Sequence, residues 1–325
     1  MKIAVIAPTA VRIPVTNYGG IELACQWQAQ ELVRRGHEVL LLGNVKDGPD
    51  PAGWTGVSMA TENSVFEEGP YAQLMACDAV SDWSHTKPFG MSRHPHYVGT
   101  TMWTDRQAGL GRDVYPSEAV RDAFKDPKGR VIPIGMPLDD VAVGDLTYWA
   151  PGPYVALGRI APYKGQDMAV RVAQAVGVQL TVAGHTGAYA DKYYALAIAK
   201  MCRDAGFPFR ADPPDLNALL DGSPGLLHLH RWNESFSIVA AQALLRGVPI
   251  LTTDVGAPQE WVRETAGGMI VRLKDLTEGR FDMPEVRAFF EMNWSSRHLG
   301  IAKRARELFD IRRVTDEYLA LWGAK

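Results

Sequence analysis

The sequence predicts an α/β protein with two Rossmann-like halves, each built on a parallel sheet. Each half opens on a short apolar run that is typical of a buried strand, Lys2–Ala7 (KIAVIA) and Tyr154–Leu157 (YVAL). After each run, amphipathic stretches alternate with further apolar runs, as in βαβ units. Between the halves, Asp139–Pro153 lacks this pattern and indicates a linker. We therefore expect two domains of similar size, joined near residue 145.

Composition and charge narrow the class of protein. Of the 325 residues, 46% are hydrophobic and 22% are charged, which is typical of a globular protein. The net charge of −3 argues against a protein that coats nucleic acid or an anionic membrane, and leaves at most a peripheral membrane contact. Cys25, Cys77 and Cys202 are scattered and form no CxxC motif, so we expect a reducing cytoplasm. No signal peptide or apolar run of membrane-spanning length is evident.

The first half begins with a βαβ unit. A loop that ends in Gly19-Gly20 leads into a predicted helix over Ile21–Arg35, and Gly36 ends this helix before a strand over His37–Leu42. The glycine spacing is not GxGxxG, so the dinucleotide-binding fingerprint is absent. The other elements expected here are a helix near Val65–Met75, strands at Cys77–Val80, Tyr97–Trp103 and Arg130–Ile134, and a helix over Ser117–Phe124.

The second half repeats this alternation. Its predicted strands after the first are Gln179–Ala183, Gly225–Leu229, Val248–Thr252 and Gly268–Val271. Its predicted helices are Gln166–Val176, Lys192–Ala205, a short one at Leu216–Leu220, then Phe236–Leu245, Pro284–Met292 and Ile301–Leu321.

Two loops of the second half carry residues suited to phosphate chemistry. The loop Asn233–Ser237 follows a predicted strand and precedes a helix, whose free N–H groups and positive dipole end favour phosphate. Glu234 lies beside this helix start and Gln242 lies within the helix. Arg159 and Lys164 share a glycine-bounded loop after another strand, from which both cations can reach a diphosphate. The alternatives are two solvated surface cations, and a glutamate that pairs with a helix dipole.

Five segments, in the right order and spacing, give the chain a family resemblance over nearly its whole length. They are YGGIELACQWQAQELVRRGHEVLLLG, VIPIGM, GRIAPYKGQD, ESFSIVAAQALLRGVPIL and DVGAPQEWV. With them the chain resembles the retaining glycosyltransferases of family four. The resemblance implies the GT-B fold, in which two Rossmann-like domains face a cleft and the C-terminal helix crosses back to the first domain. It implies an acceptor domain, a nucleotide-sugar domain and a last helix over residues 1–145, 146–305 and 306–325.

The resemblance also implies an activity. Such an enzyme transfers a sugar from a UDP- or GDP-type nucleotide diphosphate sugar to an acceptor hydroxyl, with retention at the anomeric carbon. The acceptor is a glycan, a lipid-linked sugar or a small molecule, nucleic acid is not expected, and the chain acts as a monomer or homodimer. No cofactor and no metal are expected. The alternatives are a sugar-nucleotide epimerase or hydrolase on the same fold, and an inactive module that binds nucleotide sugars.

The resemblance assigns roles to residues. Arg159, Lys164 and Glu234 are the expected catalytic residues. The expected donor-binding residues are Gly19, Gly20, His185, Phe236, Ser237, Ile238 and Gln242. The expected acceptor contacts are Trp103, Asp105 and Arg106.

The chain departs from the family pattern at a few positions. Ser237 stands where the family has Gly, Ile134 where it has Asn, and Gln242 where a second Glu usually binds the ribose hydroxyls. Gln242 offers one carbonyl acceptor and an NH₂ donor in place of two carboxylate oxygens. It either binds the ribose more weakly or only pairs with backbone. Gly19 and Gly20 either let the backbone approach a ligand or form a simple turn.

Overall fold

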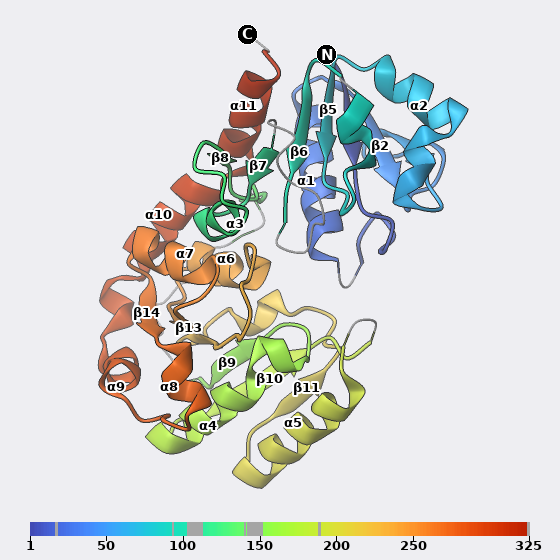
Figure 1. Ribbon diagram of the computed structural model, residues 1–325. Coiled ribbons are helices and arrows are strands. Elements are labelled where there is room, and N and C mark those ends of the chain that lie inside the picture. Colours follow the sequence, from blue (N-terminus) through green and yellow to red (C-terminus); the bar gives the residue numbers. More distant parts are fainter. Residues whose placement is uncertain are drawn as a thin grey trace. The chain divides into compact units, whose positions relative to one another are not determined.

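The computed structural model describes residues 1–16, 19–92, 94–102, 113–139, 141, 152–187 and 190–323. Within it the chain divides into two compact units, each with its own sheet (Figure 1). The first unit combines Met1–Leu138 with Phe309–Lys325, and the second is Asp139–Leu308. Most of the predicted linker Asp139–Pro153 lies outside the described residues, as do the predicted acceptor residues Trp103, Asp105 and Arg106.

The first unit is built on a sheet of eight strands in the order β3-β4-β2-β1-β5-β6-β7-β8. All neighbours are parallel except β3 and β4. The strands are β1 Lys2–Ile6, β2 Glu38–Gly43, β3 Gly48–Pro49, β4 Thr55–Ser58, β5 Ala79–Asp82, β6 Tyr97–Thr100, β7 Asp113–Tyr115 and β8 Arg130–Val131. The central strand β1 is buried from Ile3 to Ile6, which accounts for its continuous apolar sequence.

The helices of the first unit are α1 Gly20–Arg34, α2 Glu68–Met75, α3 Glu118–Ala123 and α11 Ile311–Leu321, with the 3₁₀ turns η1 Glu62–Phe66 and η2 Pro88–Ser92. At α3 the hydroxyl of Ser117 accepts a hydrogen bond from the N–H of Val120, as expected of an N-cap serine.

The predicted single helix Ile301–Leu321 is wrong, because the structure contains two helices there, α10 His298–Phe309 and α11. Asp310 interrupts them with an extended backbone, and its carboxylate caps the N–H of Arg312 at 2.9 Å. The same break lets the backbone of Met136 bond on both sides of Asp310, to the Phe309 carbonyl at 2.7 Å and from the Ile311 N–H at 3.0 Å. The periodicity of the sequence continues across this one-residue break, so the pattern alone does not reveal it.

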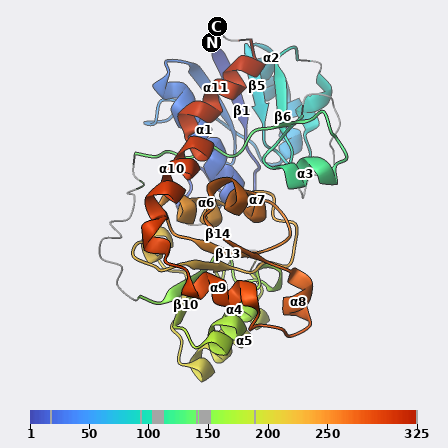
Figure 2. The same ribbon diagram turned by 90° about the vertical axis from the view of Figure 1, so that its left-hand side faces the viewer.

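Helix α11 packs on α1 in the first unit (Figure 2). Tyr318 is 1% exposed, and its hydroxyl lies 2.8 Å from that of Thr100. The Tyr318 ring stacks on Trp83 with 6.3 Å between centroids. Tyr318 therefore anchors α11 to β6, which carries Thr100, and to Trp83, which follows β5.

The second unit is built on six parallel strands in the order β11-β10-β9-β12-β13-β14. They are β9 Tyr154–Leu157, β10 Leu180–Gly184, β11 Phe209–Ala211, β12 Leu226–His228, β13 Ile250–Thr253 and β14 Gly268–Val271. The direction in which strands are added to the sheet reverses between β9 and β12. From β9 the chain adds β10 and β11 on one side, and then β12, β13 and β14 on the other. Ligands of such sheets bind beyond the carboxyl ends of the strands at this reversal.

The helices of the second unit are α4 Gln166–Val176, α5 Lys192–Ala205, α6 Ile238–Leu245, α7 Pro258–Thr265, α8 Leu273–Thr277, α9 Pro284–Glu291 and α10, with the 3₁₀ turns η4 Pro162–Lys164, η5 Asn217–Leu219 and η6 Trp294–Ser296. The predictions of β9, α4, α5 and β14 agree with the structure residue for residue. The strands β7 and β11 and the helices α7 and α8 were not predicted. Each is eight residues or fewer, too short for a clear periodic signal.

The anchoring of α11 gives a first prediction. We expect Tyr318→Ala to lower the free energy of unfolding by about 3–5 kcal/mol, because it removes a buried aromatic ring and leaves a cavity. Urea denaturation of the full chain measures the change. Tyr193→Ala is the control, since Tyr193 is 87% exposed and its removal should cost at most about 0.5 kcal/mol. Equal effects of the two substitutions would contradict the role of Tyr318.

Candidate functional site

The predicted phosphate-binding loops meet at the reversal of the second sheet. One loop follows β9 and spans Gly158–Gly165, and the other follows β12 and leads to Ser237 at the start of α6. The loops approach so closely that a Cβ on Gly165 would lie 1.8 Å from the carbonyl oxygen of Leu229. Gly165 also has φ +71°, so both space and conformation require glycine there. The structure thus brings together two loops that are about 70 residues apart in sequence.

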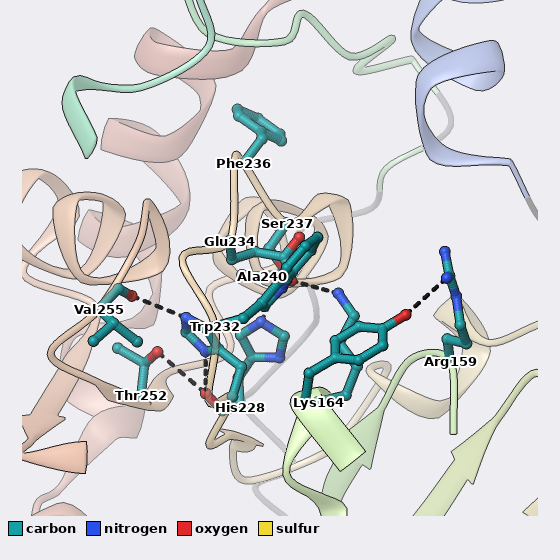
Figure 3. Close-up of polar contacts among 12 residues, drawn as sticks. Arg159, Lys164, His228, Trp232, Glu234, Phe236, Ser237, Ala240, Thr252 and Val255 are labelled. Carbon is teal, nitrogen blue, oxygen red and sulfur yellow. Dashed lines mark hydrogen bonds and ion pairs between the residues drawn. The ribbon is translucent and has the colours of Figure 1, made fainter. Parts of the chain in front are cut away.

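An ion pair joins the two loops. The Lys164 ammonium donates to Oε2 of Glu234, and the side chains are only 16% and 11% exposed (Figure 3). The indole N–H of Trp232 donates to the same oxygen at 3.0 Å. Burial raises the pKa of Glu234, but the charge and hydrogen bond of Lys164, together with the nearby His228 and His230, outweigh this effect and hold the pKa at about 2. Glu234 is therefore ionised at neutral pH.

Arg159 lies on the far side of a tyrosine from this pair. Its guanidinium donates to the hydroxyl of Tyr163 at 2.7 Å. Arg159 and Lys164 lie 5.9 and 5.8 Å from the centre of the Tyr163 ring, within the range of cation–π attraction. The Arg159 carbonyl accepts from the side chain of Gln166 at 2.8 Å, which fixes the loop to the start of α4. Two cations thus lie at one end of the sheet, as the sequence predicted, held by an aromatic residue that it did not single out.

The start of α6 lies beside Glu234 (Figure 3). Ser237 takes the place of a glycine with φ +67° and ψ +89°, a conformation that L residues rarely adopt. Its hydroxyl accepts from the N–H of Ala240 at 3.4 Å and lies 3.0 Å from Nε2 of His228. The first N–H groups of the helix, including that of Ile238, have no intrahelical acceptor. These groups are available to an anion.

Phe236 and Gly256 help to fix the conformation of the turn that precedes α6. The Phe236 ring is buried against Trp261, and its carbonyl accepts from the Trp261 indole at 2.7 Å. A Cβ on Gly256 would lie 2.4 Å from the backbone nitrogen of Glu234. Phe236 therefore acts as an anchor of the loop in this structure, and the predicted contact of its N–H with a donor stays a prediction.

Two buried histidines underlie the site and were not predicted. The rings of His228 and His230 lie 4.8 Å apart at the carboxyl end of β12. Thr252 and Thr253 donate to the carbonyls of His228 and His230 at 3.2 and 2.8 Å, and Nε2 of His230 lies 2.9 Å from the carbonyl of Val255. Burial lowers the pKa of both imidazoles, so they are neutral near pH 7. The signal in the sequence was HLH at the end of an apolar strand.

Gln242 pairs with a side chain and not with backbone. Its Oε1 accepts from Nη1 of Arg246 at 2.6 Å, and Nε of Arg246 pairs with Asp221 at 2.9 Å. The Gln242 Nε2 has no hydrogen bond to any described residue. The NH₂ group therefore has both of its donors left for a ligand, while Oε1 keeps one lone pair.

His185 adjoins the Arg159 loop through the backbone. The N–H of Ile160 donates to the His185 carbonyl at 2.9 Å, and Nδ1 of His185 lies 3.0 Å from Oδ1 of Asp212. The strands β9 and β10 are in close contact here, since a Cβ on Gly184 would lie 1.6 Å from the carbonyl oxygen of Gly158. His185 is therefore positioned next to the loop that carries the two cations.

The remaining predicted donor residues lie in the first unit. Gly19 caps α1 with φ +153°, and a Cβ there would lie 2.9 Å from the side chain of Val11. Gly20 is the first residue of α1. Their contact with a donor stays a prediction. In the part of the chain that the structure describes, no three His, Cys, Asp or Glu residues gather as metal ligands would, and no helix is long and apolar enough to cross a bilayer.

The second unit matches a known family. Residues 153–278, which include the whole second sheet, match the model of the glycosyl transferases group 1. A curated relative, the D-inositol 3-phosphate glycosyltransferase of Nocardia farcinica, is 33% identical over 139 residues, which cover 38% of this chain. The matched stretch spans 30% of that relative's length. These matches agree with the family resemblance for the second unit, which contains three of the five segments.

Solved structures share the fold over the whole chain. AviGT4, a glycosyltransferase involved in avilamycin A biosynthesis, has a TM-score of 0.74 at 20% identity, with 99% of this chain and 97% of that chain covered. A glycosyltransferase from Rickettsia africae has the same score and coverage at 11% identity. The Anabaena protein HepE, in complex with UDP-glucose, has a TM-score of 0.70 at 15% identity with both chains fully covered. The predicted GT-B fold is confirmed.

The depressed pKa of Glu234 gives a second prediction. A carboxylate whose pKa falls from 4.5 to about 2 on folding stabilises the folded state above pH 4.5, and this stabilisation is lost as the pH falls toward 2. Glutamine resembles the protonated glutamate in shape. We therefore expect Glu234→Gln to lower the free energy of unfolding by about 3 kcal/mol at pH 7 and by almost nothing near pH 2. Urea denaturation at several pH values measures this, and a pH-independent difference would contradict it.

Proposed function

We propose that this chain, whose residues 153–278 form a glycosyl transferases group 1 domain, transfers a sugar from a nucleotide diphosphate sugar to an acceptor hydroxyl. The observation that carries the proposal is the convergence of Arg159, Lys164 and Glu234 at the reversal of the second sheet. There, Lys164 and the ionised Glu234 lie beside the start of a helix, and Arg159 contacts the same Tyr163 ring as Lys164. The cations suit a diphosphate, and the carboxylate suits the hydroxyls of a sugar.

The leaving group of this reaction is a nucleoside diphosphate, which gains negative charge as its bond to the sugar breaks. Arg159 offers a planar fork of donors and Lys164 offers a compact charge. The N–H groups at the start of α6 add fixed dipoles on the same side. The Gly165 contact and the hydrogen bond from Arg159 to the Tyr163 hydroxyl already hold the loop in place, so that only the Lys164 side chain has to turn toward the developing charge.

Glu234 serves the sugar side of the donor. Its Oε2 is held by Lys164 and Trp232, and no described residue donates to its Oε1. An ionised oxygen in a largely buried position accepts hydroxyl hydrogens strongly. Its low pKa makes it an acceptor of hydrogen bonds and not a general acid at neutral pH.

We propose that transfer proceeds with retention, by attack from the face that the leaving group vacates. The acceptor oxygen forms a bond to the anomeric carbon while the bond from that carbon to the phosphate oxygen breaks. The proton of the acceptor hydroxyl passes to the leaving phosphate. No strong protein base is then needed, which suits a site whose two histidines are buried and are weak bases, since burial lowers the pKa of each.

The donor is proposed to carry UDP or GDP and to sit mainly on the second unit, with a glycan, a lipid-linked sugar or a small molecule as acceptor on the first. HepE, which shares the fold, is known in complex with UDP-glucose, and this supports a UDP-sugar as the first donor to test. The NH₂ group of Gln242 would donate to a ribose oxygen where the family usually has an accepting carboxylate.

The cation pair gives a third prediction. We expect Arg159→Ala and Lys164→Ala each to reduce the rate of sugar transfer at least about 100-fold. Each substitution removes a positive charge that would stabilise the leaving diphosphate. Transfer of label from a radioactive UDP- or GDP-sugar measures the effect. Lys192→Ala is the control, since Lys192 is an exposed cation on α5 and should leave the rate unchanged. Normal turnover in both site variants would exclude the proposed function.

The same assay separates the alternatives. Incubation with labelled donor and no acceptor should leave the donor intact. A changed sugar configuration would indicate an epimerase, and free sugar would indicate a hydrolase. Donor binding without turnover over a broad set of acceptors would indicate an inactive binding module.

Gln242 gives a fourth prediction. In Gln242→Glu, the carboxylate would keep a bond to Arg246 and offer its second oxygen to a ribose hydroxyl, so we expect roughly fivefold tighter binding of UDP. Calorimetric titration measures the dissociation constant. Gln73→Glu, an exposed change of the same charge on α2, should not alter it. If both variants bind UDP like the unaltered protein, Gln242 has no ribose contact.

A further inference from the structure

The two oxygens of the Glu234 carboxylate have different surroundings. Oε2 accepts from Lys164 and, at 3.0 Å, from the indole N–H of Trp232. Oε1 accepts from no described residue. A carboxylate with one oxygen fixed and the other open can meet a ligand hydroxyl in only one orientation. What fixes Oε2 therefore decides where Oε1 points.

Lys164 alone would fix the orientation of the Glu234 carboxylate poorly. It has a flexible four-carbon stem and three donors, and under the proposed function it turns part of its charge toward the diphosphate. Its hold on Glu234 then changes between the empty and the occupied site. The indole N–H of Trp232 is a single uncharged donor that the phosphate does not attract to the same degree.

Trp232 is held firmly by its surroundings. Its ring packs on that of Tyr163, with 5.1 Å between centroids, and lies 6.0 Å from the Lys164 ammonium (Figure 3). The preceding residue, Arg231, pins the loop from the other side. Its N–H donates to the Tyr163 carbonyl at 2.7 Å, and its guanidinium forms a two-bonded ion pair with Asp167 at 2.7 and 2.6 Å.

We propose that Trp232 is a positioning residue that determines recognition of the donor sugar. By holding Oε2 of Glu234 while Lys164 engages the diphosphate, it keeps Oε1 aimed at a hydroxyl of the sugar ring. This inference rests on the proposed function, since it assigns a partner on the sugar side of the same site. Trp232 acts through Glu234 and takes no part in bond breaking.

The proposal separates binding of the sugar from binding of the nucleotide. Trp232→Phe keeps an aromatic ring on Tyr163 but removes the N–H. We expect this variant to bind UDP as the unaltered protein does and UDP-glucose roughly fivefold to tenfold more weakly. Calorimetric titration with UDP and UDP-glucose, and with GDP and GDP-mannose, measures the ratio for whichever nucleotide binds.

Trp294→Phe is the matched control. Trp294 lies in the same unit, is 2% exposed and donates its indole N–H to the Phe289 carbonyl at 2.8 Å. This variant also loses a buried indole hydrogen bond and should lose stability, but it should bind UDP and UDP-glucose as before. It separates a specific effect of Trp232 from a general loosening of the unit.

A double-mutant cycle tests the contact without any ligand. We expect the effects of Trp232→Phe and Glu234→Ala on urea denaturation to be non-additive, because each removes one partner of the same hydrogen bond. Additive effects, or equally weakened binding of UDP and of UDP-glucose in Trp232→Phe, would overturn the proposed role of Trp232. They would leave the proposed function of the site standing. If the unaltered protein binds no nucleotide while the cycle still shows coupling, the contact is real but the proposed function and this inference both fail.

Discussion

The ion pair between Lys164 and Glu234 joins two loops that belong to different βαβ units of the second sheet. Other features of the site depend on the close approach that this pair requires. Gly165 and Gly256 leave room for the backbone beside Leu229 and Glu234, where any Cβ would overlap main-chain atoms. Trp232 and Tyr163 then cover the pair and limit its contact with water, which strengthens the attraction between the charges. The low pKa of Glu234 follows from the charge and hydrogen bond of Lys164, together with the nearby His228 and His230, against the raising effect of burial.

The sequence predicted the fold class and the limits of several elements well, for identifiable reasons. The strand β9 is a short apolar run, the helices α4 and α5 have periodic patterns, and each of the three is followed by Gly, so their limits were predicted correctly. Arg159, Lys164 and Glu234 could be grouped because each follows a strand in a parallel sheet, where carboxyl ends share one edge. The predicted acceptor residues Trp103, Asp105 and Arg106 and the donor contacts themselves stay predictions.

What the sequence did not predict concerns contacts between side chains across elements. Tyr163 and His228 lie in plain loop and strand patterns, and their roles depend on partners elsewhere, the Trp232 ring for Tyr163 and the Ser237 hydroxyl for His228. Ser237 shows why such partners matter, since a serine at φ +67° costs about 1 kcal/mol or more relative to glycine. Its hydroxyl bonds to His228 and to the N–H of Ala240, which offsets part of this strain. The departure at Ser237 is thus accompanied by a partner in the preceding strand, β12.

The first unit is assembled from both ends of the chain, Met1–Leu138 and Phe309–Lys325, whereas the second unit is one continuous segment. A ribosome therefore delivers all of the second unit before it delivers α11. Until then the surfaces of Trp83 and Thr100 that Tyr318 covers have no partner from α11. During synthesis, the first unit therefore lacks α11 until the whole of the second unit has been made.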